Sequence, residues 1–154
     1  MSSATLEPTL RLSLQRTYAA PRERVFWAWT EPEALKRWFR VAEGYSTPIA
    51  EVDLRVGGRY RLGMQPPGSA EVLLAGGVYR EVRSPERLAF TWRWEGDSPQ
   101  PETLVTIEFR QRGDLTEVVL THEGFVDAPA RDQHAGGWQG CLDRLDSALA
   151  RSEV

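Results

Sequence analysis

The chain has 154 residues, 41% of them hydrophobic, which suits one domain with a substantial core and is short for two. Its formal net charge of −3 argues against binding to nucleic acid or to an anionic membrane, since both attract basic proteins. No apolar run approaches the length of a membrane span, so we expect no membrane partner.

Cysteine usage and the first residues bear on the compartment. Cys141 is the sole cysteine, so no intramolecular disulfide can form, and a reducing compartment fits. Residues 1–9 lack the basic start and the apolar core of a signal peptide. We therefore expect a cytoplasmic protein in which residues 1–9 form a flexible arm and residues 10–150 form a single domain.

The first elements are a strand and two short helices. Apolar and polar residues alternate from Leu10 to Tyr18, a pattern typical of a half-buried strand. Pro21 ends this strand, and two helical patterns follow, the second starting at a capping box of Thr30 and Glu33. Because helices this short are unstable alone, we expect both to pack on a sheet.

Six further strands are expected between residues 50 and 122. Here the hydrophobic pattern has a period of two and is interrupted by turns rich in glycine and proline. Gly57-Gly58 predicts a tight turn, and Gly76-Gly77 inside a long strand predicts a bulge or a sharp bend. Such short connections require antiparallel pairing. The expected strands are 50–56, 60–64, 72–82, 88–94, 105–109 and 116–122.

A long amphipathic helix is predicted from Asp127 to Leu149, because apolar residues recur there at three- and four-residue steps. Asp127 is placed to cap its first turn, where Pro129 is tolerated. Three glycines in its first half leave two interpretations open. They cause a kink or a later helix start, or they leave room for a bound molecule or a close strand. These residues are Gly136, Gly137 and Gly140.

These elements predict the fold class. A seven-stranded sheet with one apolar face must curl around something, and the C-terminal helix is the only candidate. We therefore expect an α+β domain. It consists of a curved antiparallel sheet of about seven strands around a long C-terminal helix, with two short helices after the first strand.

The chain also resembles a known family over nearly its whole length. Five blocks in the right order carry the resemblance: AAPRERVFWAWTEPEALKRWF, EVDLRVGGRYRLGM, GGVYREVRSPERLAFTWRW, LTEVVLTHEGF and HAGGWQGCLDRL. Together they are similar to the bacterial single-domain relatives of the activator of the heat-shock protein 90 ATPase. That family belongs to the START-like, helix-grip superfamily, also called SRPBCC or polyketide cyclase-like.

The resemblance implies a helix-grip (START/Bet v-like) fold with a cavity between sheet and helix that often takes apolar ligands. It transfers no catalytic residues, because the superfamily shares none. Many relatives have a short Gly-Pro turn after the tryptophan of the second helix, whereas here Trp38 is followed by residues 39–42, Phe-Arg-Val-Ala. The resemblance implies that this loop borders the mouth of the cavity.

Two histidines are the first candidates for chemistry. His122 shares a strand face with apolar residues, and His134 lies on the apolar stripe of the long helix, so both are expected to point inward. His134 is the best-placed candidate for acid–base catalysis, followed by His122 and Glu81. Without a third ligand they make a poor metal site, so we expect no metal. We expect the histidines to be structural, with hydrogen bonds that join the helix start to the last strand.

Aromatic residues are the candidates for ligand binding, since the expected helix-grip geometry leaves space between sheet and helix. Trp138 is the first candidate and is expected to face Phe90 and Trp92. Cys141, one turn later on the same stripe, is expected to be a small buried hydrophobic residue. The predicted ligand-binding residues are Trp138, Phe90, Trp92, Tyr60, Tyr79, His134 and Cys141.

Three functions are consistent with these features. The first is a non-enzymatic or weakly catalytic binding protein for a small apolar or aromatic molecule. The second, which only the resemblance implies, is a co-chaperone that stimulates a heat-shock protein 90 homologue. The length of the chain argues against it, because the eukaryotic activator uses an additional N-terminal domain for which 154 residues leave no room. The third is a cyclase- or hydratase-like enzyme with a cavity histidine or glutamate. A homodimer is a further alternative. No phosphate-binding loop, nucleophile elbow or paired-cysteine motif occurs, so no cofactor is expected.

Overall fold

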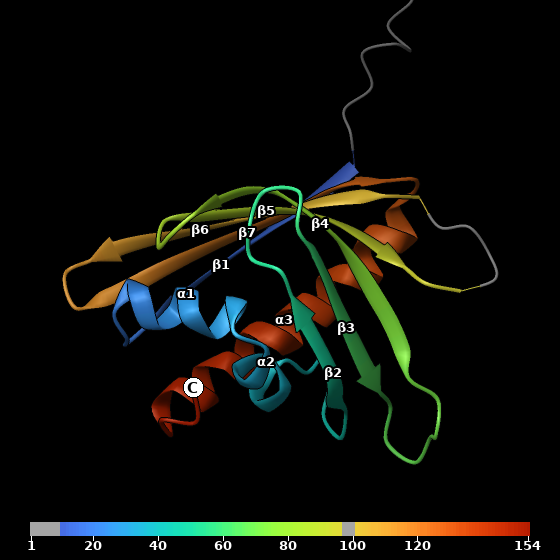
Figure 1. Ribbon diagram of the computed structural model, residues 1–154, viewed down its shortest axis with the longest axis horizontal. Helices are drawn as coiled ribbons and strands as arrows, with labels where there is room; N and C mark the ends of the chain where they lie inside the picture. The colour runs from blue at the N-terminus through green and yellow to red at the C-terminus, as the bar shows by residue number, and fades with distance from the viewer. Residues whose placement is uncertain (1–9, 97–100) are drawn as a thin grey trace, which may run out of the picture.

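The computed structural model describes residues 10–96 and 101–154, so the predicted arm at residues 1–9 lies outside the described residues (Figure 1). The elements follow the predicted order. They are β1 (Leu10–Tyr18), α1 (Arg22–Thr30), α2 (Pro32–Trp38), β2 (Ser46–Val52), β3 (Arg59–Gln65), β4 (Leu73–Arg83), β5 (Arg87–Trp94), β6 (Thr103–Arg112), β7 (Leu115–Phe125) and α3 (Ala128–Ala150).

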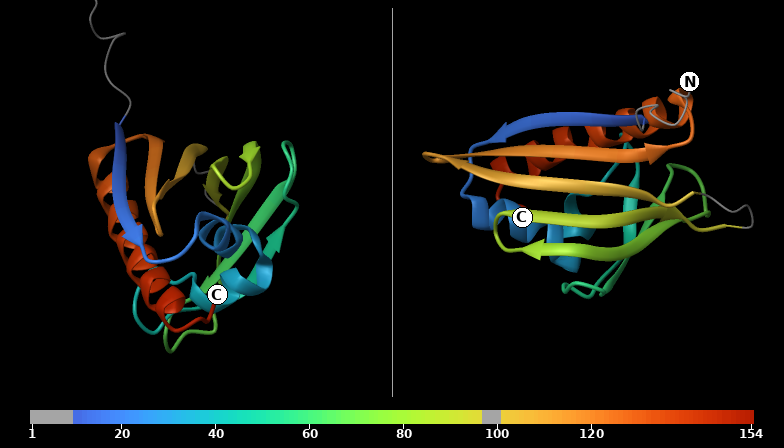
Figure 2. Two further views of the ribbon diagram at one scale, coloured as in Figure 1. Left: turned by 90° about the vertical axis from the view of Figure 1, so that its left-hand side faces the viewer. Right: turned by 90° about the horizontal axis from the view of Figure 1, so that it is seen from above.

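The strands form one antiparallel sheet in the order β1-β7-β6-β5-β4-β3-β2. Figure 2 shows that the sheet is strongly curved and that the three helices lie on its concave side. Helix α3 contacts β1, β7 and α2. The predicted α+β helix-grip fold, with seven strands and two short helices after the first strand, is confirmed.

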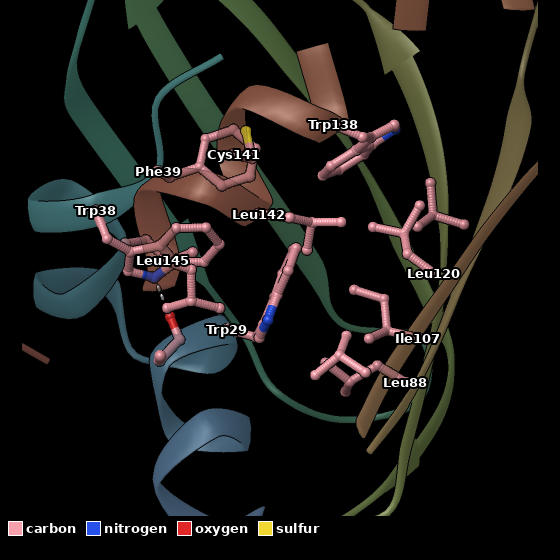
Figure 3. Close-up of a cluster of buried hydrophobic side chains, with 14 of the residues drawn as sticks. Trp29, Trp38, Phe39, Leu88, Ile107, Leu120, Trp138, Cys141, Leu142 and Leu145 are labelled. Atoms are coloured by element: carbon pink, nitrogen blue, oxygen red, sulfur yellow. Dashed lines mark hydrogen bonds between the residues drawn. The ribbon is translucent and has the colours of Figure 1, made fainter. Parts of the chain in front are cut away.

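Helix α3 forms where the sequence predicts it. Asp127 Oδ1 accepts a hydrogen bond of 2.9 Å from the backbone N–H of Ala130, which confirms the predicted N-cap. Its apolar stripe is buried; Figure 3 shows Leu142 and Leu145 on the side of the helix that faces the core. The Tyr18 hydroxyl donates a 2.9 Å hydrogen bond to the carbonyl oxygen of Leu142 and so joins β1 to the middle of the helix.

The glycines of α3 neither delay its start nor end it, since the helix runs from Ala128 to Ala150. Gly140 lies against the loop after α2: a Cβ atom at this position would be 2.2 Å from the carbonyl oxygen of Val41. A Cβ atom at Gly136 would meet nothing within 4 Å. The open space expected at the glycines is therefore taken, at Gly140, by the backbone of a loop rather than by a strand.

Two predicted boundaries are wrong. The strand expected at 50–56 is β2, which begins earlier and ends at Val52, because the chain then turns. In this turn the Gly58 N–H donates to the carbonyl oxygen of Arg55, Gly57 has a φ of 85°, and the side chain of Val56 is 66% exposed. Alternation of Leu54 and Val56 therefore does not reflect burial against the sheet.

The capping box is also wrong. Thr30 is the last residue of α1, and its hydroxyl donates to the carbonyl oxygen of Phe26, while Glu31 precedes α2 without a side-chain cap. Pro32 starts α2 instead, since its fixed φ suits a first helical residue.

The β4–β5 bulge lies elsewhere than predicted. The register shifts between Tyr79 and Glu81, not at the glycine pair. Gly77 instead permits close approach, because a Cβ atom there would be 2.0 Å from the carbonyl oxygen of Thr91 on β5.

The contact at Gly140 gives a prediction with an internal control. At a helix position where a Cβ atom meets no neighbour, a Gly→Ala substitution raises the free energy of unfolding by about 0.5–1 kcal/mol, and we expect that gain for Gly136→Ala. Gly140→Ala should instead lower the free energy of unfolding by about 1–3 kcal/mol, since Val41 must move. Urea unfolding of both variants measures this difference. Equal stabilisation by the two substitutions would contradict the close contact.

Candidate functional site: an aromatic pocket beside helix α3

A pocket of about 910 Å³ opens beside the first half of α3. The sheet contributes residues of β3, β4 and β5 to its wall, and the loop after α2 contributes Phe39 and Val41. The lining consists of Phe39, Val41, Tyr45, Met64, Glu71, Val72, Leu73, Leu74, Trp92, Trp94, Glu95, Gly96, Ala130, Gln133, His134, Gly137 and Trp138.

Three of the predicted ligand-binding residues, Trp92, His134 and Trp138, line this pocket. The Trp92 and Trp138 ring centroids are 5.2 Å apart, so the predicted approach of these two rings across the sheet–helix gap is present. On its other side the Trp138 ring packs edge-on against Phe39, with centroids 5.9 Å apart. Trp138 therefore joins the sheet wall of the pocket to the loop after α2.

The other predicted ligand-binding residues lie outside the pocket lining. Tyr60, Tyr79 and Phe90 pack on one another in a buried cluster, with the Phe90 ring centroid 5.1 Å from that of Tyr60 and 6.0 Å from that of Tyr79. Cys141 is fully buried among apolar side chains, and burial raises the pKa of its thiol. A thiol in this state is a packing group rather than a nucleophile.

His122 is part of a buried chain of hydrogen bonds. Trp138 Nε1–H donates to His122 Nδ1 at 2.9 Å, and His122 Nε2 lies 2.7 Å from the hydroxyl oxygen of Thr103. Because an indole nitrogen only donates, Nδ1 must be the unprotonated nitrogen, and Nε2–H donates to Thr103. The Thr103 hydroxyl in turn donates to the carbonyl oxygen of Trp92 at 3.0 Å.

His134 forms a second tryptophan–histidine pair beside the first. Trp94 Nε1–H donates to His134 Nε2 at 3.0 Å, so the proton is on Nδ1, which donates to the carbonyl oxygen of Ala130 at 2.7 Å. The His122 and His134 ring centroids are 5.3 Å apart, and the two neutral rings carry their protons on opposite nitrogens.

This arrangement leaves neither histidine free for proton transfer. Both nitrogens of each ring are engaged in hydrogen bonds within the protein. Burial lowers the pKa of His122 to about 3, and the nearby His134 adds to the effect. A general base needs a pKa near neutrality and a free nitrogen, so the geometry at His122 is that of a structural residue.

Glu81, the third catalytic candidate, lies away from the pocket. Its carboxylate accepts a hydrogen bond of 2.8 Å from Arg87 and forms a second ion pair with Arg83 at 3.4 Å. The hydrogen bond from Arg87 lowers the pKa of Glu81, which is the opposite of what a general acid at neutral pH requires.

Two further features concern metals and membranes. Among residues 10–96 and 101–154, no group of three or more His, Cys, Asp or Glu side chains is placed to hold a metal ion. No helix in these ranges combines the length and the apolar character needed to cross a bilayer.

Comparison with known proteins identifies the family. The family model described as activator of Hsp90 ATPase homolog 1-like protein matches residues 19–150. The chain belongs to this family. No curated protein matches it.

Several solved structures have the same fold as this chain. A protein from Chromobacterium violaceum is 30% identical, with a TM-score of 0.79 over 90% of this chain and 96% of its own. The AHSA1 protein from Silicibacter pomeroyi is 25% identical, with a TM-score of 0.82 over 93% and 99%. An Hsp90 activator from Plasmodium falciparum is 24% identical, with a TM-score of 0.71 over 92% and 96%, and shows likeness of fold alone.

Two residues that hydrogen-bond to the histidines beside the pocket went unrecognised in the sequence. Thr103 completes the His122 chain, and Trp94 fixes His134, yet neither was predicted as a site residue. For Trp94 a signal existed, because it alternates with Trp92 on one face of β5. For Thr103 there was none, since its role depends on pairing between β6 and β7.

The buried hydrogen bond from Trp138 gives a prediction with a matched control. Trp138→Phe removes the donor and leaves His122 Nδ1 unpaired, whereas the indole nitrogen of Trp29 is buried without a partner among the described residues. Both substitutions shrink a buried ring, so their difference isolates the hydrogen bond. Trp138→Phe should cost about 1–2 kcal/mol more than Trp29→Phe in urea unfolding. Equal losses of unfolding free energy in the two variants would show that the hydrogen bond from Trp138 to His122 does not stabilise the fold.

The low pKa of His122 gives a pH dependence. Below pH 6.5 the unfolded chain protonates this ring, while the folded protein keeps it neutral down to about pH 3. The unfolded state therefore binds more protons in this window, and stability should fall by about 1 kcal/mol per pH unit as the pH drops.

His122→Gln removes that proton site but keeps an amide at the position. The difference in unfolding free energy between the protein and this variant should shrink from neutral pH toward about pH 4, as measured by urea unfolding at several pH values. A difference that stays constant over this range would show that His122 does not titrate as described.

Proposed function

We propose that this member of the activator of Hsp90 ATPase homolog 1-like family binds a small apolar or aromatic molecule in the pocket beside α3. The observation that carries the proposal is the pocket itself. Its volume of about 910 Å³ lies within the range of small-molecule sites, roughly 300–1,000 Å³. Its wall is mainly aromatic and aliphatic, as in sites that bury most of a ligand's surface.

The wall is held in place before any ligand enters. The Trp138 and Trp94 side chains are each fixed by a hydrogen bond to a histidine, and Trp92 is 4% exposed and packs on Trp138. Binding to such a wall requires little ordering of side chains, so more of the contact energy appears as affinity.

Small residues on α3 keep the pocket open. Ala130 and Gly137 line it from the helix side, where larger side chains would project into the space. A Cβ atom at Gly137 would have ordinary contacts of 3.7 Å with Val41, so packing against that loop alone does not require a glycine here. A wall formed by helix backbone supports a role in admitting a ligand.

An enzymatic role has less support. A cyclase- or hydratase-like reaction needs a group that can take up a proton from the substrate, and both nitrogens of His122 and His134 are already engaged. Glu81 is bound to Arg87 outside the pocket lining. We therefore propose binding rather than catalysis.

Stimulation of a heat-shock protein 90 homologue is the second candidate function. It is supported by membership of the family and by the likeness of fold to the Hsp90 activator from Plasmodium falciparum. The ATPase rate of the chaperone from the same cell should then rise on addition of this protein. An unchanged rate at a large molar excess would rule out this function.

Filling the pocket tests ligand binding. The probe is N-phenyl-1-naphthylamine, a neutral aromatic dye that fluoresces in apolar surroundings. We expect saturable binding to the unmodified protein and at least about tenfold weaker binding to Ala130→Phe, whose ring would occupy the pocket. Ala150→Phe, the same change at an exposed position on the same helix, is the control and should bind normally.

Failure of the unmodified protein to bind the dye, or equal binding by both variants, would contradict ligand binding in the pocket beside α3. Native mass spectrometry of protein purified from its own host complements the dye experiment, since a retained molecule would reveal the ligand class by its mass.

A further inference from the structure

The charged side chains that line the pocket are of one sign. Its lining contains two carboxylates, Glu71 and Glu95, and no lysine or arginine among the described residues. We infer that the pocket prefers an aromatic ligand that carries a protonated amine, with the amine placed at Glu71. This inference rests on the proposed function and names the chemical class of its ligand.

The two carboxylates differ in their availability. Arg61 donates to both oxygens of Glu95, each at 2.8 Å, so a partner already neutralises that charge. Glu71 forms no ion pair within residues 10–96 and 101–154. Its backbone N–H donates to the Ser69 hydroxyl at 3.0 Å within the β3–β4 loop. Glu71 is therefore the carboxylate that remains for a ligand cation.

The aromatic wall favours the same sign of charge. Indole faces attract cations through their negative π-systems, and tryptophan is the strongest of the aromatic side chains in this respect. Trp92, Trp94 and Trp138 all line the pocket, together with Phe39 and Tyr45; Trp92 and Trp138 are buried in the wall, and Trp94 is the more exposed of the three tryptophans. A cationic ligand thus meets attraction from both the wall and Glu71.

An anionic ligand would find few free donors. The indole N–H groups of Trp94 and Trp138 are already bonded to histidines, and both nitrogens of His134 are engaged. The Trp92 N–H has no partner among the described residues but is sealed from solvent. A carboxylate would exchange its water for an apolar wall and a negative neighbour, which is unfavourable. Gln133 and Tyr45, which are uncharged, can serve either sign.

Three probes with one ring system test the preference: 1-naphthylmethylamine, 1-naphthylmethanol and 1-naphthoate, which are cationic, neutral and anionic at neutral pH. Isothermal titration calorimetry should give the lowest Kd for the amine, about fivefold below the alcohol and more than about tenfold below the carboxylate. Added salt should weaken the preference for the amine, because Glu71 is exposed.

Glu71→Gln should reduce the advantage of the amine over the alcohol by about twofold to fivefold and leave alcohol binding unchanged. Asp114→Asn, an equal change of charge in the β6–β7 turn, is the control and should leave all three Kd values unchanged. Equal or tighter binding of the alcohol or carboxylate would overturn the inference while the proposed function stands. An amine preference that survives Glu71→Gln would overturn the role of Glu71. Absence of binding by all three probes would instead overturn the proposed function.

Discussion

Helix α3 carries a stripe of apolar side chains over its 23 residues, and the rest of the structure is arranged to remove that stripe from water. Covering a helix from one side requires a curved sheet, and the antiparallel order β1-β7-β6-β5-β4-β3-β2 provides it. The loop after α2 then approaches so closely that only a glycine fits at position 140, against Val41. Close packing along this helix thus determines where backbone can lie and where space remains.

The same packing determines the state of the polar groups inside. Indole and imidazole nitrogens enter the core with the aromatic rings, and each must find a partner or remain unpaired at a cost. Trp138 with His122 and Trp94 with His134 solve this by pairing one donor with one acceptor. His122 consequently stays neutral, and both histidines are hydrogen-bonded within the protein, so residues that suggest catalysis in the sequence act as supports for the pocket wall.

Family membership and local geometry inform different levels of function. The helix-grip fold hosts unrelated activities, so the family assigns the architecture more firmly than the ligand. Charge and wall chemistry at the pocket are properties of this chain's own residues. Glu71 and the three tryptophans therefore carry the proposal on ligand class, whereas the co-chaperone function depends on the family and on likeness of fold.

Local patterns in the sequence determined which residues face inward. Alternation placed Trp92, Trp94 and His122 on the inner face of the sheet, and helical spacing placed His134 and Trp138 on the inner face of α3. Those periods follow from backbone geometry within one element, so the sequence was sufficient for the order of elements, the fold class and the end of the sheet–helix gap at which the two histidines lie.

Only the tertiary structure decided which inward residues meet. The contacts of Trp138 with His122 and of His122 with Thr103 join α3, β7 and β6, and no local pattern encodes the distance between such segments. The same holds for Gly140 against Val41, and for the early end of β2, where the backbone turns at Gly57-Gly58 although alternation continues to Val56. A period fixes the direction of a side chain, whereas its neighbours depend on how separate elements pack.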